Sequence, residues 1–178
     1  KIKNYPLFLP KKQMNKKLEI MDAAQAEMKL KRIAYEIVEN NIGQKEIVLA
    51  GIRENGVVVA EILRQHIKRI SELKVDLITI QINKQHPIEC AIETAFDASG
   101  KNIVMVDDVA DSGKTMMYAL RPFLQTIPAS IQVAVLVDRK HKKYPITSDY
   151  TGLQLSTTLQ ENIRVECKDG KVVGAFVI

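Results

Sequence analysis

The chain has 178 residues, of which 46% are hydrophobic and 26% charged, a composition that suits one globular domain with a buried core. Its two cysteines, Cys90 and Cys167, are too few and too far apart for a disulfide framework, which fits a reducing cytosol. Its apolar runs fall short of the roughly 20 residues that span a bilayer. We therefore expect a cytoplasmic protein with no membrane partner.

The net charge of +5 is concentrated near the N-terminus. The first 17 residues contain six lysines and no acidic residue, so 5 minus 6 leaves about −1 for the rest of the chain. We interpret residues 1–21 as a basic tail and residues 22–178 as a single domain. A solvated tail explains these lysines more simply than a nucleic-acid-binding arm does.

Hydrophobic periodicity predicts a helix, a strand and a second helix in the first half of the chain. Asp22 and Gln25 have the spacing of a capping box, and apolar residues then recur at helical spacing as far as residue 40. The run EIVLAGI, residues 46–52, is typical of a buried strand. After the turn RENG, residues 59–70 again follow a helical period, with His66 on the apolar face as a packed core histidine.

Strands and helices continue to alternate along the chain. We predict a strand at 74–83, an irregular segment at 84–101, a strand at 102–106, a helix at 115–127 and a strand at 131–137. This alternation predicts an α/β fold whose mostly parallel central sheet is flanked by helices. The end of the chain differs, because two strand-like runs surround Asp169-Gly170, a strong signal for a type I′ hairpin.

The stretch NIVMVDDVADSGKTMM, residues 102–117, contains the strongest functional signal. It contains SGKT, residues 112–115, but a Walker A loop needs glycine five residues before Gly113, where this chain has Asp108. What remains is a buried strand that ends at Asp107 and Asp108, followed by a small polar loop that opens a helix. In a parallel sheet, ligands bind at this end of the strands.

The loop Asp111-Ser112-Gly113-Lys114-Thr115 offers backbone N–H groups and hydroxyls that suit a phosphate monoester. Asp107 and Asp108 would repel that phosphate, so we expect them to bind a hydroxylated or cationic group beside it, such as a ribose diol or Mg²⁺. A simpler alternative is that the aspartates cap the next helix, which explains one acid but not the cluster.

VMVDDVADSGKT resembles the 5-phosphoribosyl-1-diphosphate (PRPP) motif of type I phosphoribosyltransferases. The resemblance implies the fold of that family, including a small hood over the carboxyl ends of the strands. It also implies that Asp107 and Asp108 hold the ribose 2′ and 3′ hydroxyls, directly or through Mg²⁺. Residues Asp111, Ser112, Gly113, Lys114 and Thr115 would then bind the 5′-phosphate.

Two further segments agree with the resemblance, which covers nearly all of the chain from about residue 21 onward. The turn in GIRENG lies where these enzymes carry a pyrophosphate-binding loop, which implies that role for Arg53, Glu54, Asn55 and Gly56. AVLVDRKHKKYPITSDYTG, residues 134–152, is similar to the corresponding stretch of the bifunctional pyrimidine-operon attenuators and uracil phosphoribosyltransferases. By that likeness the nucleobase would contact Asp138, Arg139, Tyr150 and Thr151.

Asp111 and the segment 80–100 set this chain apart from the attenuators. Asp111 resembles the aspartate of the purine phosphoribosyltransferases that lies against the base, which makes it the candidate general base. In the segment 80–100 the attenuators carry a Tyr-Arg-Asp-Asp run, whereas this chain has a shorter stretch with no arginine, QINKQHPIECAIE. Lys84 replaces the charge of that arginine but not its bidentate geometry.

The function that we expect is transfer of the phosphoribosyl group of PRPP to a nucleobase with release of pyrophosphate, a pentosyltransferase reaction of nucleotide salvage. The expected cofactor is Mg²⁺, and the expected partners are PRPP, a nucleobase or its nucleotide, and further copies of the chain in a dimer or tetramer. The alternative is an RNA-binding pyrimidine attenuation regulator, or a weakly active nucleotide sensor, on the same fold. Its support is the basic cluster His141-Lys142-Lys143, and Tyr35 counts against it because the attenuators carry histidine there.

Overall fold

The computed structural model describes residues 17–83, 86–156 and 161–178. Its strands are β1 (Leu18–Asp22), β2 (Glu46–Ile52), β3 (Lys74–Ile82), β4 (Cys90–Ile92), β5 (Asn102–Ala110), β6 (Ser130–Arg139), β7 (Tyr150–Leu155), β8 (Ile163–Lys168) and β9 (Lys171–Val177). Its helices are α1 (Ala23–Asn40), α2 (Asn55–Ile70), α3 (Lys114–Ala119) and the 3-10 helix η1 (Arg121–Gln125). Within these described ranges, no helix has the length and apolar character needed to cross a membrane.

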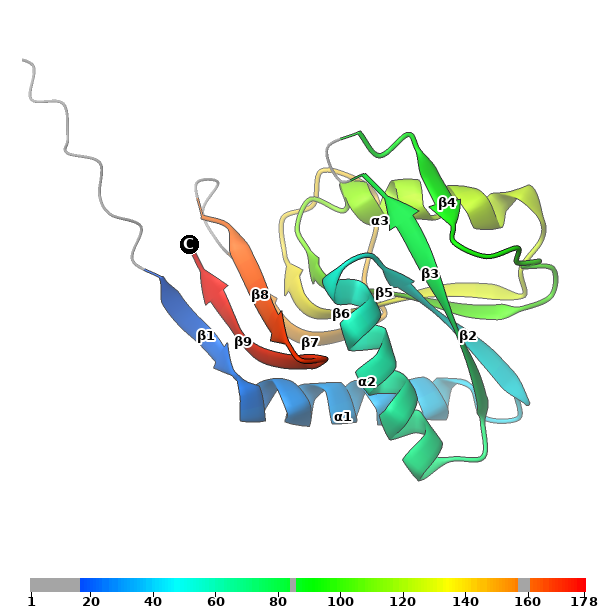
Figure 1. Cartoon of the computed structure of the whole chain (residues 1–178), viewed down its shortest axis with the longest axis horizontal. Helices are drawn as coiled ribbons and strands as arrows, with labels where there is room; N and C mark the ends of the chain where they lie inside the picture. The colour runs from blue at the N-terminus through cyan, green and yellow to red at the C-terminus, as the bar shows by residue number, and fades with distance from the viewer. Residues whose placement is uncertain (1–16, 84–85, 157–160) are drawn as a thin grey trace, which may run out of the picture.

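The central sheet has six strands in the order β4-β3-β2-β5-β6-β7, and all of its pairings are parallel except that of β3 with β4. Side chains of alternate residues enter two separate cores: Ile47 and Leu49 of β2 lie in one, and Val48 and Ala50 in the other. Helices α1 and α2 cover one face, and α3 with η1 covers the other (Figure 1). The predicted α/β fold with a mostly parallel sheet is therefore confirmed.

The capping box at the start of α1 forms as predicted. The Asp22 Oδ1 atom accepts a hydrogen bond from the Gln25 backbone N–H at 2.7 Å, and the Gln25 Oε1 atom accepts one from the Asp22 N–H at 3.0 Å. His66 of α2 is 6% exposed, and its Nε2 atom lies 3.0 Å from Glu27 Oε1 of α1. This histidine therefore joins α1 to α2 on the face of the sheet that these two helices cover.

A second sheet, in the order β1-β9-β8, forms the small hood (Figure 1). The turn between β8 and β9 has positive φ at Asp169 (50°) and Gly170 (72°), as a type I′ hairpin requires. The last residues of the expected N-terminal tail, 18–21, lie in β1, which pairs with β9, and Met21 is 1% exposed. Residues 1–16 of the expected tail lie outside the described residues.

Three other differences from the expected elements concern local packing. The short strand β4 lies in the segment expected to be irregular, where it pairs with β3. The helix expected at 115–127 ends at Ala119 and continues as η1, which has Pro122 near its start, where a missing N–H costs nothing. The edge strand β7 was not predicted, and it places Tyr150 in the core.

Candidate active site

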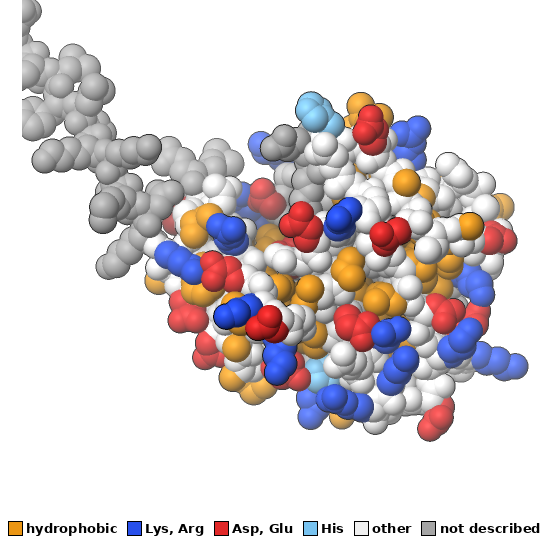
Figure 2. All heavy atoms as spheres, viewed as in Figure 1, with side chains coloured by type: hydrophobic (Ala, Val, Ile, Leu, Met, Phe, Trp, Pro, Cys, Tyr) orange, Lys and Arg blue, Asp and Glu red, His pale blue; other side chains and the backbone are white. Residues whose placement is uncertain are grey.

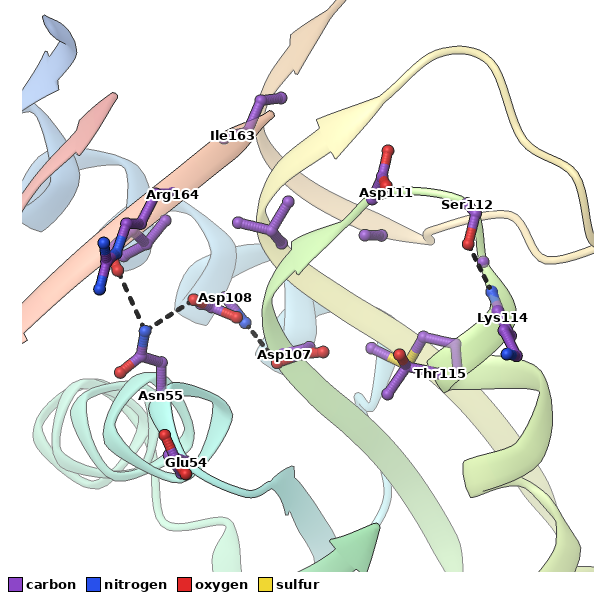
Figure 3. Close-up of a pocket in the computed structure, with 15 residues that line it drawn as sticks. Glu54, Asn55, Asp107, Asp108, Asp111, Ser112, Lys114, Thr115, Ile163 and Arg164 are labelled. Atoms are coloured by element: carbon purple, nitrogen blue, oxygen red, sulfur yellow. Dashed lines mark hydrogen bonds between the residues drawn. The ribbon is translucent and has the colours of Figure 1, made fainter. Parts of the chain in front are cut away.

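A pocket lies at the carboxyl end of β5, where the order of the strands reverses. The chain runs from β2 to β3 on one side of the sheet, whereas β5 pairs with the other side of β2, which is the arrangement that opens a ligand crevice in doubly wound sheets. The pocket has a volume of about 430 Å³. Three segments line it, residues 54–55, 107–116 and 163–165 (Figure 3).

Asp107 and Asp108 form the centre of this pocket. Their exposed fractions are 1% and 7%, so both carboxylates are largely withdrawn from bulk water. The Asp107 Oδ1 atom accepts a hydrogen bond from the Asp108 backbone N–H at 2.9 Å, and Asp108 Oδ2 accepts one from Asn55 Nδ2 at 2.8 Å. Buried carboxylates are stable when they are hydrogen-bonded or bind a cation, and these two meet the first condition.

The turn after β2 supplies the second wall of the pocket. A Cβ atom on Gly56 would lie 2.7 Å from Val106 O and 3.1 Å from Asp107 Cα, so only glycine lets the start of α2 pack this closely on β5. Asn55 Nδ2 also donates to Val165 O of the hood at 3.0 Å. Glu54 and Asn55 line the pocket, whereas the Arg53 guanidinium donates to Gln81 Oε1 at 2.6 Å and does not.

The small polar loop forms the third wall. Gly113 has a φ of +79°, which permits the sharp turn into α3. The carbonyl oxygen of Ser112 accepts hydrogen bonds from the backbone N–H groups of Lys143 (3.0 Å) and Tyr144 (3.1 Å). All five residues from 111 to 115 line the pocket, so the loop predicted to bind a phosphate does lie beside the two aspartates.

Residues 138–142 support this loop from behind. Arg139 Nη1 donates to Asp111 Oδ1 at 2.6 Å, and Lys142 Nζ donates to Ala110 O at 2.7 Å. Lys142 also forms an ion pair with Asp138, a carboxylate that further accepts hydrogen bonds from Ser148 Oγ and Gln154 Nε2. Asp138 and Arg139, both expected to contact the base, are 5% and 9% exposed and are absent from the lining of the pocket.

Tyr150, which we expected to contact the base, lies in the core and is absent from the lining of the pocket. Tyr150 is 1% exposed and pairs with Ala134, four residues before Asp138 on β6 and so about 13 Å from that end of the sheet. Its hydroxyl accepts from Asn40 Nδ2 (3.2 Å) and donates to Gln132 Oε1 (3.1 Å). Burial, the largest cause, raises its pKa.

Thr151, the last residue expected at the base, also lies away from the pocket. Its carbonyl oxygen accepts a hydrogen bond from Arg32 Nη2 of α1 at 2.7 Å. Tyr150, the aromatic residue next to Asp149, therefore belongs to the packing of β7 against α1. This packing arises because β7 is an edge strand and α1 covers it.

The residues that the hood contributes to the pocket were not predicted from the sequence; they are Ile163, Arg164 and Val165 of β8. The hairpin itself was predicted, but no sequence signal indicates that it folds back over β5. Cys167 of the same strand lies near the site, and burial together with the charge of Asp108 raises the pKa of its thiol to about 11. This thiol is therefore protonated at neutral pH and unsuited to nucleophilic chemistry.

The basic cluster His141-Lys142-Lys143 does not present all of its charges to solvent. The Lys142 side chain is 15% exposed and is paired with Asp138, which is 6% exposed as a side chain. On the face that Figure 2 shows, Lys and Arg side chains are interspersed with Asp and Glu side chains. These observations reduce the support for an RNA-binding surface at this loop.

The two aspartates suit Mg²⁺, a cation that prefers carboxylate oxygens and commonly takes only one or two of them together with substrate phosphates. Among the residues that the structure describes, no group of three or more His, Cys, Asp or Glu side chains could hold a metal ion.

Solved structures of low sequence identity share this fold. A hypoxanthine-guanine phosphoribosyltransferase from Bacillus anthracis matches 88% of this chain and 96% of its own, with a TM-score of 0.70 and 23% identity. The hypoxanthine phosphoribosyltransferase of Trypanosoma cruzi, in its complex with the product IMP, matches 93% of this chain and 87% of its own, with a TM-score of 0.73 and 16% identity.

Relatives of higher identity carry the name bifunctional protein PyrR. The protein from Listeria welshimeri is 34% identical over 169 residues, which are 88% of this chain and 92% of the relative. The protein from Caldicellulosiruptor bescii is 36% identical over 162 residues, which are 85% of this chain and 89% of the relative. The model of the phosphoribosyl transferase domain matches residues 17–169. The chain therefore belongs to the phosphoribosyl transferase domain family.

Proposed function

We propose that this phosphoribosyltransferase transfers the phosphoribosyl group of PRPP to a nucleobase nitrogen and releases pyrophosphate. The observation that carries the proposal is the order of groups in the pocket: Asp107 and Asp108 lie between the polar loop 111–115 and the turn 54–55. PRPP has the matching order, because its ribose diol lies between a 5′-phosphate and a 1-diphosphate.

In the proposed complex, Ser112, Thr115 and the backbone of the loop bind the 5′-phosphate. Asp107 and Asp108 accept hydrogen bonds from the ribose hydroxyls, which orients C1′ toward the base. Bound Mg²⁺ would offset the negative charge of the departing diphosphate, and the same two aspartates would hold it. Asp111, whose side chain is 55% exposed, accepts the proton that the base loses as its nitrogen bonds to C1′ and the bond from C1′ to the diphosphate oxygen breaks.

A panel assay of pyrophosphate release tests the function and identifies the base. The full chain is incubated with PRPP, Mg²⁺ and, in turn, uracil, hypoxanthine, guanine, xanthine, adenine and orotate. We expect turnover with at least one base. If no base supports turnover although PRPP or a nucleotide binds, the protein is a nucleotide sensor and the enzymatic proposal is wrong.

Binding to RNA is the second candidate function, favoured by the sequence resemblance to pyrimidine-operon attenuators and by the basic cluster His141-Lys142-Lys143. The pairing of Lys142 with Asp138 leaves few basic groups near the loop for phosphates. A plot of log affinity against log salt concentration should then be shallow, because each neutralised phosphate contributes about −0.7 to −0.9 to the slope. Tight, sequence-selective binding with a steep slope would favour the regulator over the enzyme.

We also propose that the chain assembles into a homo-oligomer, a dimer or tetramer. Exposed apolar residues support this: Met28 and Tyr35 of α1, and Ile42 two residues after its end, are 65%, 51% and 79% exposed. Sedimentation velocity measures the assembly directly, and a monomer at micromolar concentration would contradict the proposal.

A further inference from the structure

Arg164 lies on the side of the pocket that faces the start of α2. In Figure 3, Arg164 and Asn55 lie on one side, Ser112, Lys114 and Thr115 lie on the other, and the two aspartates lie between them. The hydrogen bond from Asn55 Nδ2 to Val165 O, 3.0 Å long, fixes the neighbouring residue of β8 against α2. Arg164 is therefore held next to the turn 54–55 by a strand and not by a loose loop.

The proposed binding of PRPP places its diphosphate on this side. If the 5′-phosphate binds at residues 111–115 and the diol at Asp107 and Asp108, the opposite end of the ribose points toward Glu54, Asn55 and Arg164. The two nearest carboxylates there, Glu54 and Asp108, would repel a diphosphate. A cation on this side is needed to bind the anion and to stabilise it as it leaves.

The other basic residues near the pocket either pair with another side chain or lie on the opposite side of the pocket. The Arg53 guanidinium donates to Gln81 outside the lining of the pocket, Arg139 is paired with Asp111, and Lys142 is paired with Asp138. Lys114 lines the pocket, but on the side of the phosphate loop. Arg164 is exposed, lines the pocket, and is engaged by no hydrogen bond or ion pair among the described residues.

We propose that Arg164 binds the diphosphate of PRPP and stabilises it as the leaving group, the role that the sequence analysis assigned to Arg53. The planar guanidinium suits bidentate binding of phosphate oxygens. The inference rests on the proposed function, since it presumes that PRPP is the ligand. It also supplies an arginine to the pocket of a chain whose segment 80–100 contains none.

The test compares ligands with and without a diphosphate. Titration calorimetry with Mg²⁺ measures the affinities of Arg164→Gln, Arg164→Lys and the wild type for PRPP, ribose 5-phosphate and a nucleoside monophosphate. For Arg164→Gln we expect PRPP to bind about 10- to 100-fold more weakly, the range for hydrogen bonds to charged groups, and ribose 5-phosphate to bind as before. Arg164→Lys keeps the positive charge but loses the planar, bidentate guanidinium, so this variant should bind PRPP with intermediate affinity.

Lys168→Gln is the matched control, because Lys168 is an exposed cation on the same strand and does not line the pocket. It removes the same net charge and should leave PRPP affinity unchanged. Thermal unfolding of each variant shows whether the fold is intact.

Three results would overturn the proposal for Arg164. PRPP affinity equal to that of the wild type in Arg164→Gln excludes the contact. An equal loss for PRPP and ribose 5-phosphate indicates a general electrostatic effect, and a loss confined to the nucleoside monophosphate indicates that Arg164 contacts the base. These results differ from failure of the proposed function itself, in which the wild type binds no PRPP.

Discussion

The Asn55 Nδ2 atom lies 2.8 Å from Asp108 Oδ2 and 3.0 Å from Val165 O. One amide group thus joins the start of α2, the end of β5 and the hood. Because an amide N–H₂ group has two donors, Asn55 satisfies both acceptors at once. The contact fixes the carboxylate of Asp108 and the hood relative to each other, which gives the pocket its shape before any ligand binds.

We expect Asp107→Asn and Asp108→Asn each to weaken PRPP binding in Mg²⁺ by about tenfold or more, because each variant loses a charged acceptor for the ribose hydroxyls or the cation. Both should remain folded, since asparagine has nearly the same volume and its amide oxygen still accepts from the groups that Asp107 and Asp108 now bind. Calorimetry measures the affinity. Asp76→Asn, an exposed position on β3 whose partner is Lys74, is the control and should bind as the wild type does. Unchanged affinity in both pocket variants would contradict the ribose assignment.

Asp111→Asn should lower kcat by about 100-fold and leave PRPP affinity almost unchanged, because asparagine keeps the shape of the side chain but cannot accept a proton. Loss of the general base should also change the pH dependence of kcat. Steady-state kinetics across pH, with the base identified by the panel assay, provides the measurement. If turnover stays near that of the wild type, Asp111 only caps the loop and accepts the hydrogen bond from Arg139. Another group must then take the proton.

Lys142→Met should destabilise the protein by about 3 to 5 kcal/mol, because it leaves the buried Asp138 carboxylate without its cation. The double variant Lys142→Met/Asp138→Asn removes the uncompensated charge and should recover most of this loss. Urea denaturation measures both. Lys143→Met changes an exposed neighbour and should alter the free energy of unfolding by less than about 0.5 kcal/mol. Equal effects of the Lys142 and Lys143 variants would show that the ion pair contributes nothing.

Cys167 should react slowly with iodoacetamide. An ordinary thiol with a pKa of 9.0 is half ionised at pH 9, whereas a pKa of about 11 leaves only about 1% as thiolate, so the folded protein should react far more slowly than the chain unfolded in urea. The sign of the effect of Asp108 follows from its charge: it raises the thiol pKa, so Asp108→Asn should lower the pKa and speed the reaction. Mass spectrometry in a Cys90→Ser background measures the rate. Equal rates in folded and unfolded chains would contradict the raised pKa.

Local sequence patterns predicted the elements whose cause is local. The capping box at Asp22 and Gln25 forms because its two side chains and two N–H groups lie within four residues. The type I′ turn at Asp169-Gly170 forms because these residues tolerate positive φ. Asp107 and Asp108 were expected at the carboxyl end of a buried strand, and they lie in the last part of β5, which continues to Ala110.

Contacts between distant segments could not be predicted in this way. Tyr150 was assigned to the base, but its hydroxyl is bonded to residues 110 and 18 positions away, Asn40 and Gln132. Lys142 was counted in the basic cluster, yet the fold brings its ammonium group against the loop 111–115, where it pairs with Asp138 and the carbonyl oxygen of Ala110. Such pairs depend on which strands become neighbours, a property of the whole sheet.

The sequence by itself determined the class of fold, the acidic strand end and the polar loop beside it, since each depends on residue types within a few positions. Only the tertiary structure decided which cation lines the pocket on the side of the turn 54–55. Arg53 follows β2 directly but bonds to Gln81, whereas Arg164 reaches the pocket because β8 folds back across 56 residues of chain from Asp108. The physical reason is that hydrophobic packing of the hood on the central sheet, and not the local sequence, sets where the side chains of β8 lie.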